Sequence, residues 1–182
     1  MEILAANLKD SKKIFSIIER CKEKLVSQGI YQWDDEYPNL INIQEDIKTG
    51  ALYEGVLESQ IASIISFNEN QEKEYLTVNW RYTNGIILVI HRLAVDPDFQ
   101  GLGLSSILMK YVENYAIENS YSAIRLDAYT GNEMILDFYR RKGYQEAGEF
   151  YFPSRSLPFK CFEKSVPEFN KSNSSDAKKM RG

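Results

Sequence analysis

Hydrophobic and polar residues recur along this chain with two different periods, which predict its helices and strands. A short apolar run at residues 2–5 indicates a first strand. Asp10 and Ser11 can then cap a helix whose apolar positions keep helical spacing: Ile14, Ile17, Ile18, Cys21 and Leu25. Gly29 is placed to end this helix, and a second, shorter helix is expected over residues 39–49.

Strand-like runs follow in the middle of the chain. Residues 51–57 and 60–67 are apolar and are separated by two turn residues, which predicts a hairpin. Residues 68–84 are polar but carry three aromatic side chains, Tyr75, Trp80 and Tyr82. Linkers rarely carry so many aromatics, so we expect a long ordered excursion here.

The second half alternates between strands and helices. Residues 86–95 are almost all apolar, as in a central strand covered on both faces. The helix after it has an apolar stripe of Leu104, Ile107, Leu108, Tyr111, Val112 and Tyr115. Further elements are expected at residues 123–128 (strand), 132–141 (helix), 144–152 (strand) and 157–165 (strand).

This order of elements predicts a fold of the α/β class. A single domain over residues 1–166 would have a mixed central β-sheet flanked by helices. Residues 167–182 are polar and basic, and we expect them to form a disordered tail.

Composition and charge narrow the class of protein. The net charge is −4, which is unfavourable for general nucleic-acid binding. No run approaches the ~18 apolar residues of a membrane span. The chain has one histidine, two distant cysteines and no metal-binding motif. We therefore expect no metal, no nucleic-acid or membrane partner, reduced thiols and a cytoplasmic protein.

A glycine-containing turn after the central strand offers a place for phosphate. Gly101 and Gly103 lie at the mouth of a helix expected from about Leu102, and the first amides of a helix have no acceptor within it. Glycine lets an anion approach the backbone, and the helix dipole favours negative charge there. Amides from about Gly101 to Ser106, with the hydroxyls of Ser105 and Ser106, could hold a pyrophosphate.

Two other nucleotide-binding motifs fit this turn less well. A Walker loop needs a Gly-Lys-Ser/Thr ending, and the lysine is absent. A Rossmann fingerprint needs a third glycine, where Ser106 stands, and a first glycine directly after the strand, whereas residues 96–100 intervene. Asp127 does end the next strand, as a ribose-binding acid would, so a nucleotide-binding oxidoreductase stays open as an alternative.

The turn and its flanking segments resemble the GNAT family of acetyltransferases. Gln100-Gly101-Leu102-Gly103-Leu104-Ser105 is similar to the family's Gln/Arg-x-x-Gly-x-Gly/Ala signature, with serine as the last small residue. Residues 93–97 resemble the strand and turn that precede it. Residues 132–144 resemble the family's Asn…Tyr…Gly-Phe segment, with Tyr144 where phenylalanine is common. The resemblance covers about residues 86–152.

The resemblance implies a GNAT-like fold whose sheet is splayed near an acyl-CoA site. Pantetheine would pair with the central strand, and the pyrophosphate would lie on the glycine turn. The cofactor-binding residues would be Leu93, Ala94, Val95, Gln100, Gly101, Leu102, Gly103, Leu104, Ser105, Ser106, Asn132 and Tyr139. An amide near Val95 would polarise the thioester carbonyl, and Tyr139 would protonate the leaving thiolate.

The spacing of Asn132 and Tyr139 can also be considered without the family. They lie seven residues apart on one helical face, about 10 Å along the axis. Asn132 could bind a pantetheine amide while Tyr139 reaches the sulfur. Two structural alternatives stay open: Asn132 follows Gly131 and could simply cap the helix, and Tyr139 could be a core aromatic with a bonded hydroxyl.

Candidate groups for the acceptor are less specific. His91 could be a general base, and its parity with Leu93 and Val95 predicts that it shares their face; a hydrogen-bonded structural histidine is the alternative. Trp33 and Asp34 belong to a loop expected to cover the acceptor.

Tyr75 and Trp80 could line the same acceptor site. They could equally anchor the excursion in which they lie.

The sequence therefore predicts an N-acetyltransferase that moves an acetyl group from acetyl-CoA to a primary amine of a small molecule or peptide by direct attack. Cys21 and Cys161 are expected to lie outside the site. The main alternative is a non-catalytic acyl-CoA-binding or sensing domain. A further alternative is an interaction module, suggested only by the aromatics of residues 75–82. A homodimer is also expected from the resemblance.

Overall fold

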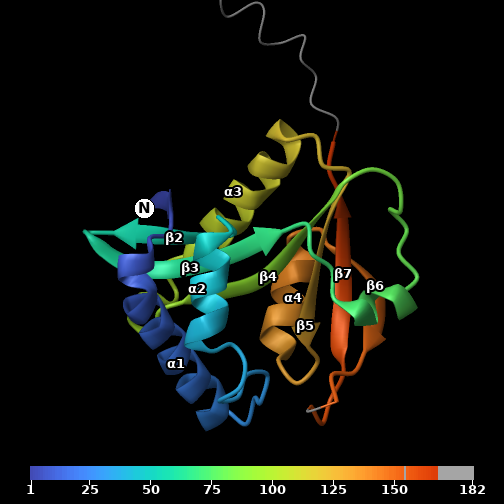
Figure 1. The fold of residues 1–182 in the computed structure, drawn as a ribbon. Coiled ribbons are helices and arrows are strands. Elements are labelled where there is room, and N and C mark those ends of the chain that lie inside the picture. The colour runs from blue at the N-terminus through green and yellow to red at the C-terminus, as the bar shows by residue number, and fades with distance from the viewer. Residues whose placement is uncertain (154, 168–182) are drawn as a thin grey trace, which may run out of the picture.

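The computed structural model describes residues 1–153 and 155–167, which form a seven-stranded mixed sheet with helices on both faces (Figure 1). The strands are β1 (Glu2–Ala5), β2 (Leu52–Leu57), β3 (Gln60–Asn68), β4 (Ile87–Val95), β5 (Ala123–Tyr129), β6 (Gln145–Phe150) and β7 (Phe159–Ser165). The helices are α1 (Ser11–Ser27), α2 (Leu40–Lys48), α3 (Leu104–Glu118) and α4 (Glu133–Arg141). The predicted order and fold class are confirmed; the predicted tail lies outside the described residues, apart from Pro167.

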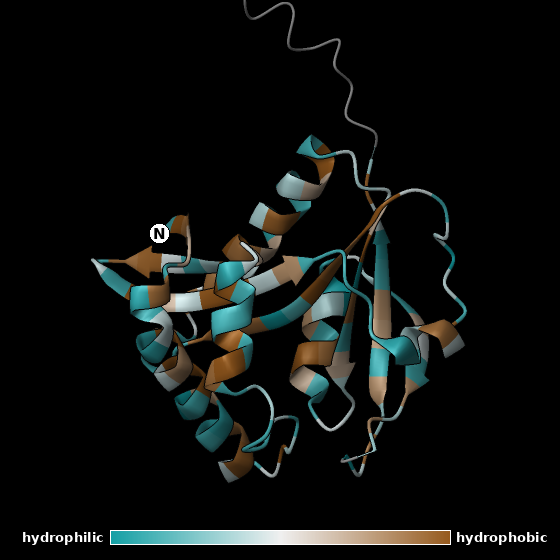
Figure 2. Ribbon diagram, viewed as in Figure 1, coloured by the Kyte–Doolittle hydropathy of each residue, from teal (hydrophilic) through white to brown (hydrophobic). Residues whose placement is uncertain are grey.

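The helices form two apolar layers against the sheet. Ile14 and Ile18 of α1 and Ile43 of α2 pack on one face, with Leu52 and Ile64 of the sheet. Helices α3 and α4 pack on the other face. Figure 2 shows hydrophilic and hydrophobic stretches on each helix, as expected for helices with one buried side. In the part of the chain that the structure describes, no helix combines the length and apolarity needed to cross a membrane.

The strands run in the order β1-β2-β3-β4-β5-β7-β6, and only β4 and β5 pair in parallel. Their pairing is short. Residues Ile87 to Ile90 of β4 pair with Ala123 to Leu126 of β5, and beyond this point the two strands separate. The rest of β5 pairs only with β7, and the rest of β4 only with β3. The sheet is therefore splayed at its centre, as the resemblance implies.

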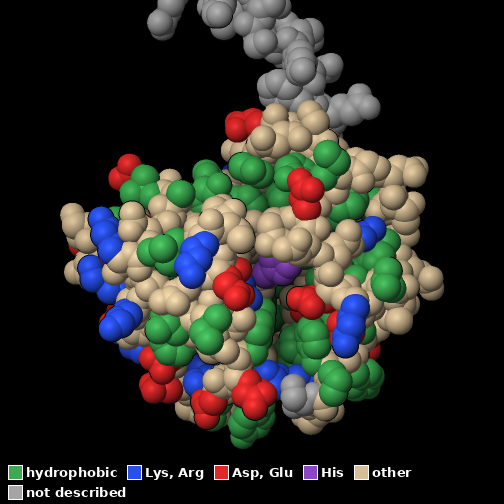
Figure 3. Space-filling view, in the orientation of Figure 1, with side chains coloured by type: hydrophobic (Ala, Val, Ile, Leu, Met, Phe, Trp, Pro, Cys, Tyr) green, Lys and Arg blue, Asp and Glu red, His purple; other side chains and the backbone are tan. Residues whose placement is uncertain are grey.

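A β-bulge in β4 changes the predicted orientation of His91. Ser66 pairs with Arg92 and Phe67 pairs with Ile90, so His91 has no partner on β3. An extra residue shifts the alternation of side chains by one position. His91 thus accompanies Arg92 toward the face that carries α1 and α2 (Figure 3), whereas Leu93 packs against the core under α3 and α4. The prediction that His91 shares the face of Leu93 and Val95 is wrong.

The excursion between β3 and β4 is ordered, and its aromatic residues anchor it. The guanidinium of Arg125 lies 4.2 Å from the ring centroid of Trp80. The buried carboxylate of Glu163 accepts hydrogen bonds from the backbone N–H groups of Arg81 and Tyr82. These contacts fix the short 3-10 helix η2 (Lys73–Thr77) against the sheet, next to the end of β5.

Candidate active site

A cavity of about 890 Å³ lies where β4 and β5 separate. Its walls come from α1, the loop over residues 32–37, β4, the turn before α3, β5, α4 and residues 152, 153, 155 and 159. Figure 3 shows the only histidine in the hollow on the face that carries α1 and α2. Because α4 belongs to the opposite layer, the cavity passes between two strands of the sheet and receives side chains from both layers.

The glycine turn forms one end of the cavity. Gly101 and Gly103 have φ angles of 85° and 76°, a left-handed conformation that glycine favours and that a helix cannot include. Helix α3 therefore begins at Leu104, not near Leu102 as predicted. A Cβ added at either glycine would meet no atom within 4 Å, so the space above the turn is open.

The first turn of α3 has the properties of an anion site. Gly103 provides no side-chain cap, and no acidic residue lies in this turn. The amides of Leu104 and Ser105 thus lack an acceptor within the helix. The amide of Ser106 already donates to the carbonyl of Gly103 at 3.0 Å, so the set of available amides is shorter than predicted. Open space and two unpaired amides are the features that a diphosphate would require of this turn.

The residues predicted to hold the pyrophosphate divide into two groups around this end. Gln100, Gly101 and Ser105 line the cavity. Its lining does not include Leu102, Gly103, Leu104 or Ser106. The Gln100 side chain donates to the carbonyl oxygen of Val95 at 3.0 Å and accepts from Lys24 at 2.5 Å, so it fixes the turn against the end of β4.

The part of β4 beyond the split has no strand on the side of β5, although the Val95 carbonyl accepts from Gln100 and Cys21. The N–H of Asp96 donates to Ala62 on β3, and antiparallel pairing alternates, so Ala94 also directs its backbone groups toward β3. Leu93 and Val95 direct theirs the other way, into the cavity. Leu93, Ala94 and Val95 all line it. An extended amide chain could therefore pair with β4 in place of β5.

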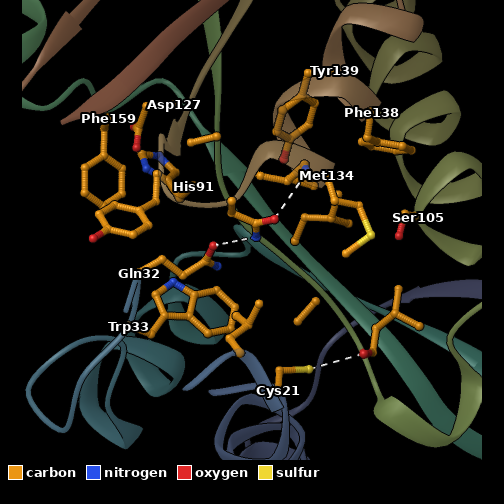
Figure 4. Close-up of a pocket in the computed structure, with 18 of the residues that line it drawn as sticks. Cys21, Gln32, Trp33, His91, Ser105, Asp127, Met134, Phe138, Tyr139 and Phe159 are labelled. Atoms are coloured by element: carbon orange, nitrogen blue, oxygen red, sulfur yellow. Dashed lines mark hydrogen bonds between the residues drawn. The ribbon is translucent and has the colours of Figure 1, made fainter. Parts of the chain in front are cut away.

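Helix α4 presents Asn132 and Tyr139 to the cavity. Asn132 caps the helix, its Oδ1 accepting from the N–H of Ile135 at 3.3 Å, while its Nδ2 donates to Oε1 of Gln32 at 3.0 Å (Figure 4). The alternative that Asn132 is a helix cap is thus realised in this structure. Gln32 was not predicted, and its place in a loop 100 residues away carries no local signal.

The hydroxyl of Tyr139 points into the cavity (Figure 4). Its ring is buried, but among the described residues the hydroxyl has no hydrogen-bond partner. Burial raises the pKa of Tyr139 above its ordinary value, and the negative charge of Asp127 raises this pKa further. The phenol therefore stays protonated at neutral pH and is free to donate.

His91 also lines the cavity. Its Nε2 lies 2.8 Å from Oδ1 of Asn68. Burial lowers the pKa of His91 to about 4, with a smaller contribution from the adjacent Arg92. The imidazole is therefore neutral at pH 7 and binds a proton weakly.

Two acidic residues of the cavity were not among the predicted site residues. Asp127 lies in β5, two residues before its end, and its Oδ1 accepts a hydrogen bond of 2.7 Å from the Tyr75 hydroxyl. Burial raises the pKa of Asp127 to about 6; the Tyr75 hydrogen bond opposes this, and Glu72 adds to it. Glu72 lines the same cavity, and burial also raises its pKa. The sequence feature that could have identified Asp127 is a charged residue within an apolar strand. Glu72 lies in a polar stretch, where no such feature distinguishes it.

The predicted acceptor residues are only partly brought together. Trp33 lines the cavity. Asp34 stands behind it, paired with Arg155, whose hydrogen bond lowers the pKa of the Asp34 carboxyl. Tyr75 is buried behind Asp127, and the indole N–H of Trp80 donates to the carbonyl of Tyr75 at 2.9 Å. Asp34, Tyr75 and Trp80 do not belong to the cavity lining.

Cys21 corrects another expectation, because it lines the cavity rather than lying outside it. Its thiol donates to the carbonyl oxygen of Val95 at 3.2 Å (Figure 4). Burial raises the pKa of Cys21 to about 11, so it is a thiol and a poor nucleophile at neutral pH. Cys161 is buried in β7. Residues 1–153 and 155–167 contain no group of three or more His, Cys, Asp or Glu side chains arranged to hold a metal ion.

Comparison with known proteins agrees with this arrangement. The Acetyltransferase (GNAT) family profile matches residues 12–144. The chain is similar to YesJ of Bacillus subtilis, an uncharacterized N-acetyltransferase, with 24% identity over 159 residues and 86% of each chain covered.

Solved structures share the fold. A GNAT-family acetyltransferase from Streptococcus agalactiae has a TM-score of 0.79 at 23% identity, covering 92% of this chain and 96% of that one. A ribosomal-protein-alanine N-acetyltransferase from Brucella melitensis has a TM-score of 0.68 at 15% identity, covering 91% and 100%. With a family match over most of its length and a sheet split beside a glycine turn, this chain belongs to the GNAT family of acetyltransferases.

Proposed function

We propose that the protein transfers an acetyl group from acetyl-CoA to a primary amine by direct attack. The observation that carries this proposal is the separation of β4 from β5 beyond Ile90. It leaves the N–H groups of Leu93 and Val95 without a strand partner, between an open glycine turn and the Tyr139 hydroxyl. Pantetheine amides match these N–H groups, and the diphosphate of CoA matches the amides at the start of α3.

The same geometry supports a role for each group in acetyl transfer. The N–H of Val95 is directed into the cavity and can donate to the thioester carbonyl oxygen as charge develops there. Tyr139 can donate its proton to the departing thiolate. Binding both substrates in one cavity removes the need for a covalent acetyl-enzyme, in agreement with the protonated state of Cys21.

A non-catalytic acyl-CoA-binding domain would need these N–H groups of β4 and the turn, but not the acid–base groups. Tyr139 has an unpaired hydroxyl in the cavity within the described chain, and Asp127 has a pKa near 6 in the same cavity. These groups favour catalysis over sensing.

A panel of primary amines incubated with acetyl-CoA tests the proposal, with released CoA measured by a thiol reagent. We expect amine-dependent CoA release and a rise in the melting temperature with acetyl-CoA alone. Stabilisation by acetyl-CoA without release for any amine would assign the sensing role. Absence of both effects would contradict the acyl-CoA assignment.

We further propose that the protein works in a reducing compartment such as the cytoplasm, because both cysteines are free and buried. The homodimer suggested by the family remains a prediction, which sedimentation analysis would test.

A further inference from the structure

Two carboxylates face the end of the cavity that lies away from the glycine turn. Asp127 lies at the same end as His91 and Phe159, and Ser105 lies on the opposite side (Figure 4). One carboxylate oxygen of Asp127 is held by Tyr75. Glu72 precedes η2, and in the described part of the chain its carboxylate makes no hydrogen bond or ion pair. Both acids therefore keep oxygens available to a ligand.

Aromatic side chains surround these acids. The aromatic residues of the cavity lining on this side are Trp33, Tyr37, Tyr129, Phe152 and Phe159. Arg155 also lines the cavity, but it is paired with Asp34. Negative charge among aromatic faces suits a cation with an apolar body, since ring faces also attract cations. The same surroundings are unfavourable for a carboxylate.

We propose that this end binds the acceptor as an ammonium ion between Asp127 and Glu72, that Asp127 is the general base, and that the acceptor has an apolar body with no carboxylate beside its amine. This inference rests on the proposed acetyl transfer and specifies the acceptor class and base.

The proposed acetyl transfer balances in protons and electrons with groups that line the cavity. Asp127 takes one proton from the ammonium, and the freed nitrogen lone pair forms a bond to the thioester carbonyl carbon. The carbon–sulfur bond breaks, and the thiolate takes the Tyr139 proton. The second nitrogen proton then returns to the Tyr139 phenolate, and Asp127 loses its proton to solvent. The products are the amide, CoA and one proton.

Asp127 suits this role better than His91. A base near pKa 6 is ionised at neutral pH and still binds a proton with useful strength, whereas one near 4 binds it weakly. The titratable groups that interact electrostatically with Asp127 come from η2 and the residue before it, the loop before α2, α4 and β7. They are Glu72, Glu74, Tyr75, Tyr37, Tyr139 and Cys161.

The pH dependence of kcat/KM tests the base, with a saturating acetyl-CoA concentration and phenethylamine as acceptor. Wild-type kcat/KM should fall as pH drops through about 6, because Asp127 becomes protonated. Tyr75→Phe removes a hydrogen bond that lowers this pKa. The acid limb of the pH profile, which is the fall in kcat/KM at low pH, should therefore move to higher pH. Glu72→Gln removes a negative charge that raises this pKa, so the limb should move to lower pH.

Asp127→Asn should lower kcat by about 10²–10⁴-fold and abolish the limb. Glu149→Gln, which removes a carboxylate from the exposed edge strand β6, is the matched control and should leave the limb unchanged. His91→Asn should leave it unchanged as well. Loss of the limb in His91→Asn, or its retention in Asp127→Asn, would overturn the assignment of the base. If Asp127→Asn fails to fold, the opposite shifts of Tyr75→Phe and Glu72→Gln decide; shifts in the same direction would contradict it.

Matched acceptors test the substrate class. Phenethylamine should exceed phenylalanine in kcat/KM, and isoamylamine should exceed leucine, each by at least about tenfold, because the amino acid carries a like charge toward the two acids. Equal use of the amino acids would contradict the acceptor class while leaving acetyl transfer intact. CoA release with none of the amines would instead contradict the proposed function itself.

Discussion

Tyr139 combines a buried ring with a hydroxyl that has no partner in the described chain. Tyr139→Phe should therefore change stability little while removing a proton donor from the cavity. We expect kcat to fall by at least about tenfold, with a much smaller change in KM for acetyl-CoA, because the interaction belongs to the transition state. Steady-state kinetics and the melting temperature of the same variant measure both effects.

Tyr144→Phe is the matched control for this variant. Tyr144 is a buried neighbour whose ring centroid lies 6.0 Å from that of Tyr139, its hydroxyl is also unpartnered, and it does not line the cavity. Its substitution should leave kcat unchanged. A folded Tyr139→Phe protein with wild-type kcat, when chemistry limits the rate, would eliminate Tyr139 as the acid.

Asp127 should reduce the stability of the protein at neutral pH. Its folded pKa is raised from 3.8 to about 6, so folding favours the protonated form, and stability is lost as pH rises through about 6. Asp127→Asn keeps the shape without the charge. We expect its melting temperature to exceed that of the wild type at pH 7, with a difference that shrinks toward pH 4. Thermal melts across this pH range measure it; a variant less stable at every pH would refute the expectation.

Only some of the residues of the candidate site could be placed together from the sequence. Asn132 and Tyr139 could be placed on one helix face because both lie in a short segment with a fixed period. The hydrogen bond between Tyr75 and Asp127 could not be predicted, because 52 residues separate them in the sequence and only the fold of the ordered excursion brings them together. Burial shifted the pKa values of His91 and Asp127 in opposite directions, and burial at a strand split is not visible in a local pattern.

At the scale of elements, the turn before α3 provides the sharpest test of acyl-CoA binding. Gly103→Val would place a branched side chain in the open space above the turn. Gly50 is the matched control, since its φ of 74° is close to the 76° of Gly103, it also has open space, and it lies at the end of α2. Both variants should carry similar backbone strain.

Calorimetry on the two folded variants should separate strain from binding. We expect Gly103→Val to weaken acetyl-CoA binding by at least about tenfold and Gly50→Val to leave it near wild type, because only the first blocks the anion. Equal affinities would remove the turn from the account of CoA binding.

The periods of the sequence predicted the elements closely. Asn39, at the start of the segment 39–49, caps α2 through a reciprocal hydrogen-bond pair with Asn42. Two features could not be predicted from these periods. The start of α3 depended on the left-handed glycines, and the bulge at His91 depended on pairing with a distant strand. Both are set by tertiary geometry, so a local period could not reveal them.

At the scale of the whole molecule, the cavity crosses the sheet, so both substrates can occupy it together. Initial velocities should give intersecting double-reciprocal lines, as for a ternary complex. Cys21→Ala should keep kcat within about twofold, because a thiol with a pKa of about 11 is not a nucleophile at neutral pH. Parallel lines, with an acetyl adduct detected by mass spectrometry, would contradict direct transfer.

The separated strands would make the proposed cosubstrate, acetyl-CoA, a structural part of the sheet. Without it, the amides of Leu93 and Val95 have no strand opposite them, while those of Ala94 and Asp96 point toward β3. Amide hydrogen exchange should therefore alternate with a period of two along this segment, fast at Leu93 and Val95 and slow between them. Acetyl-CoA should slow only the fast positions, as if an eighth strand had been added to the seven.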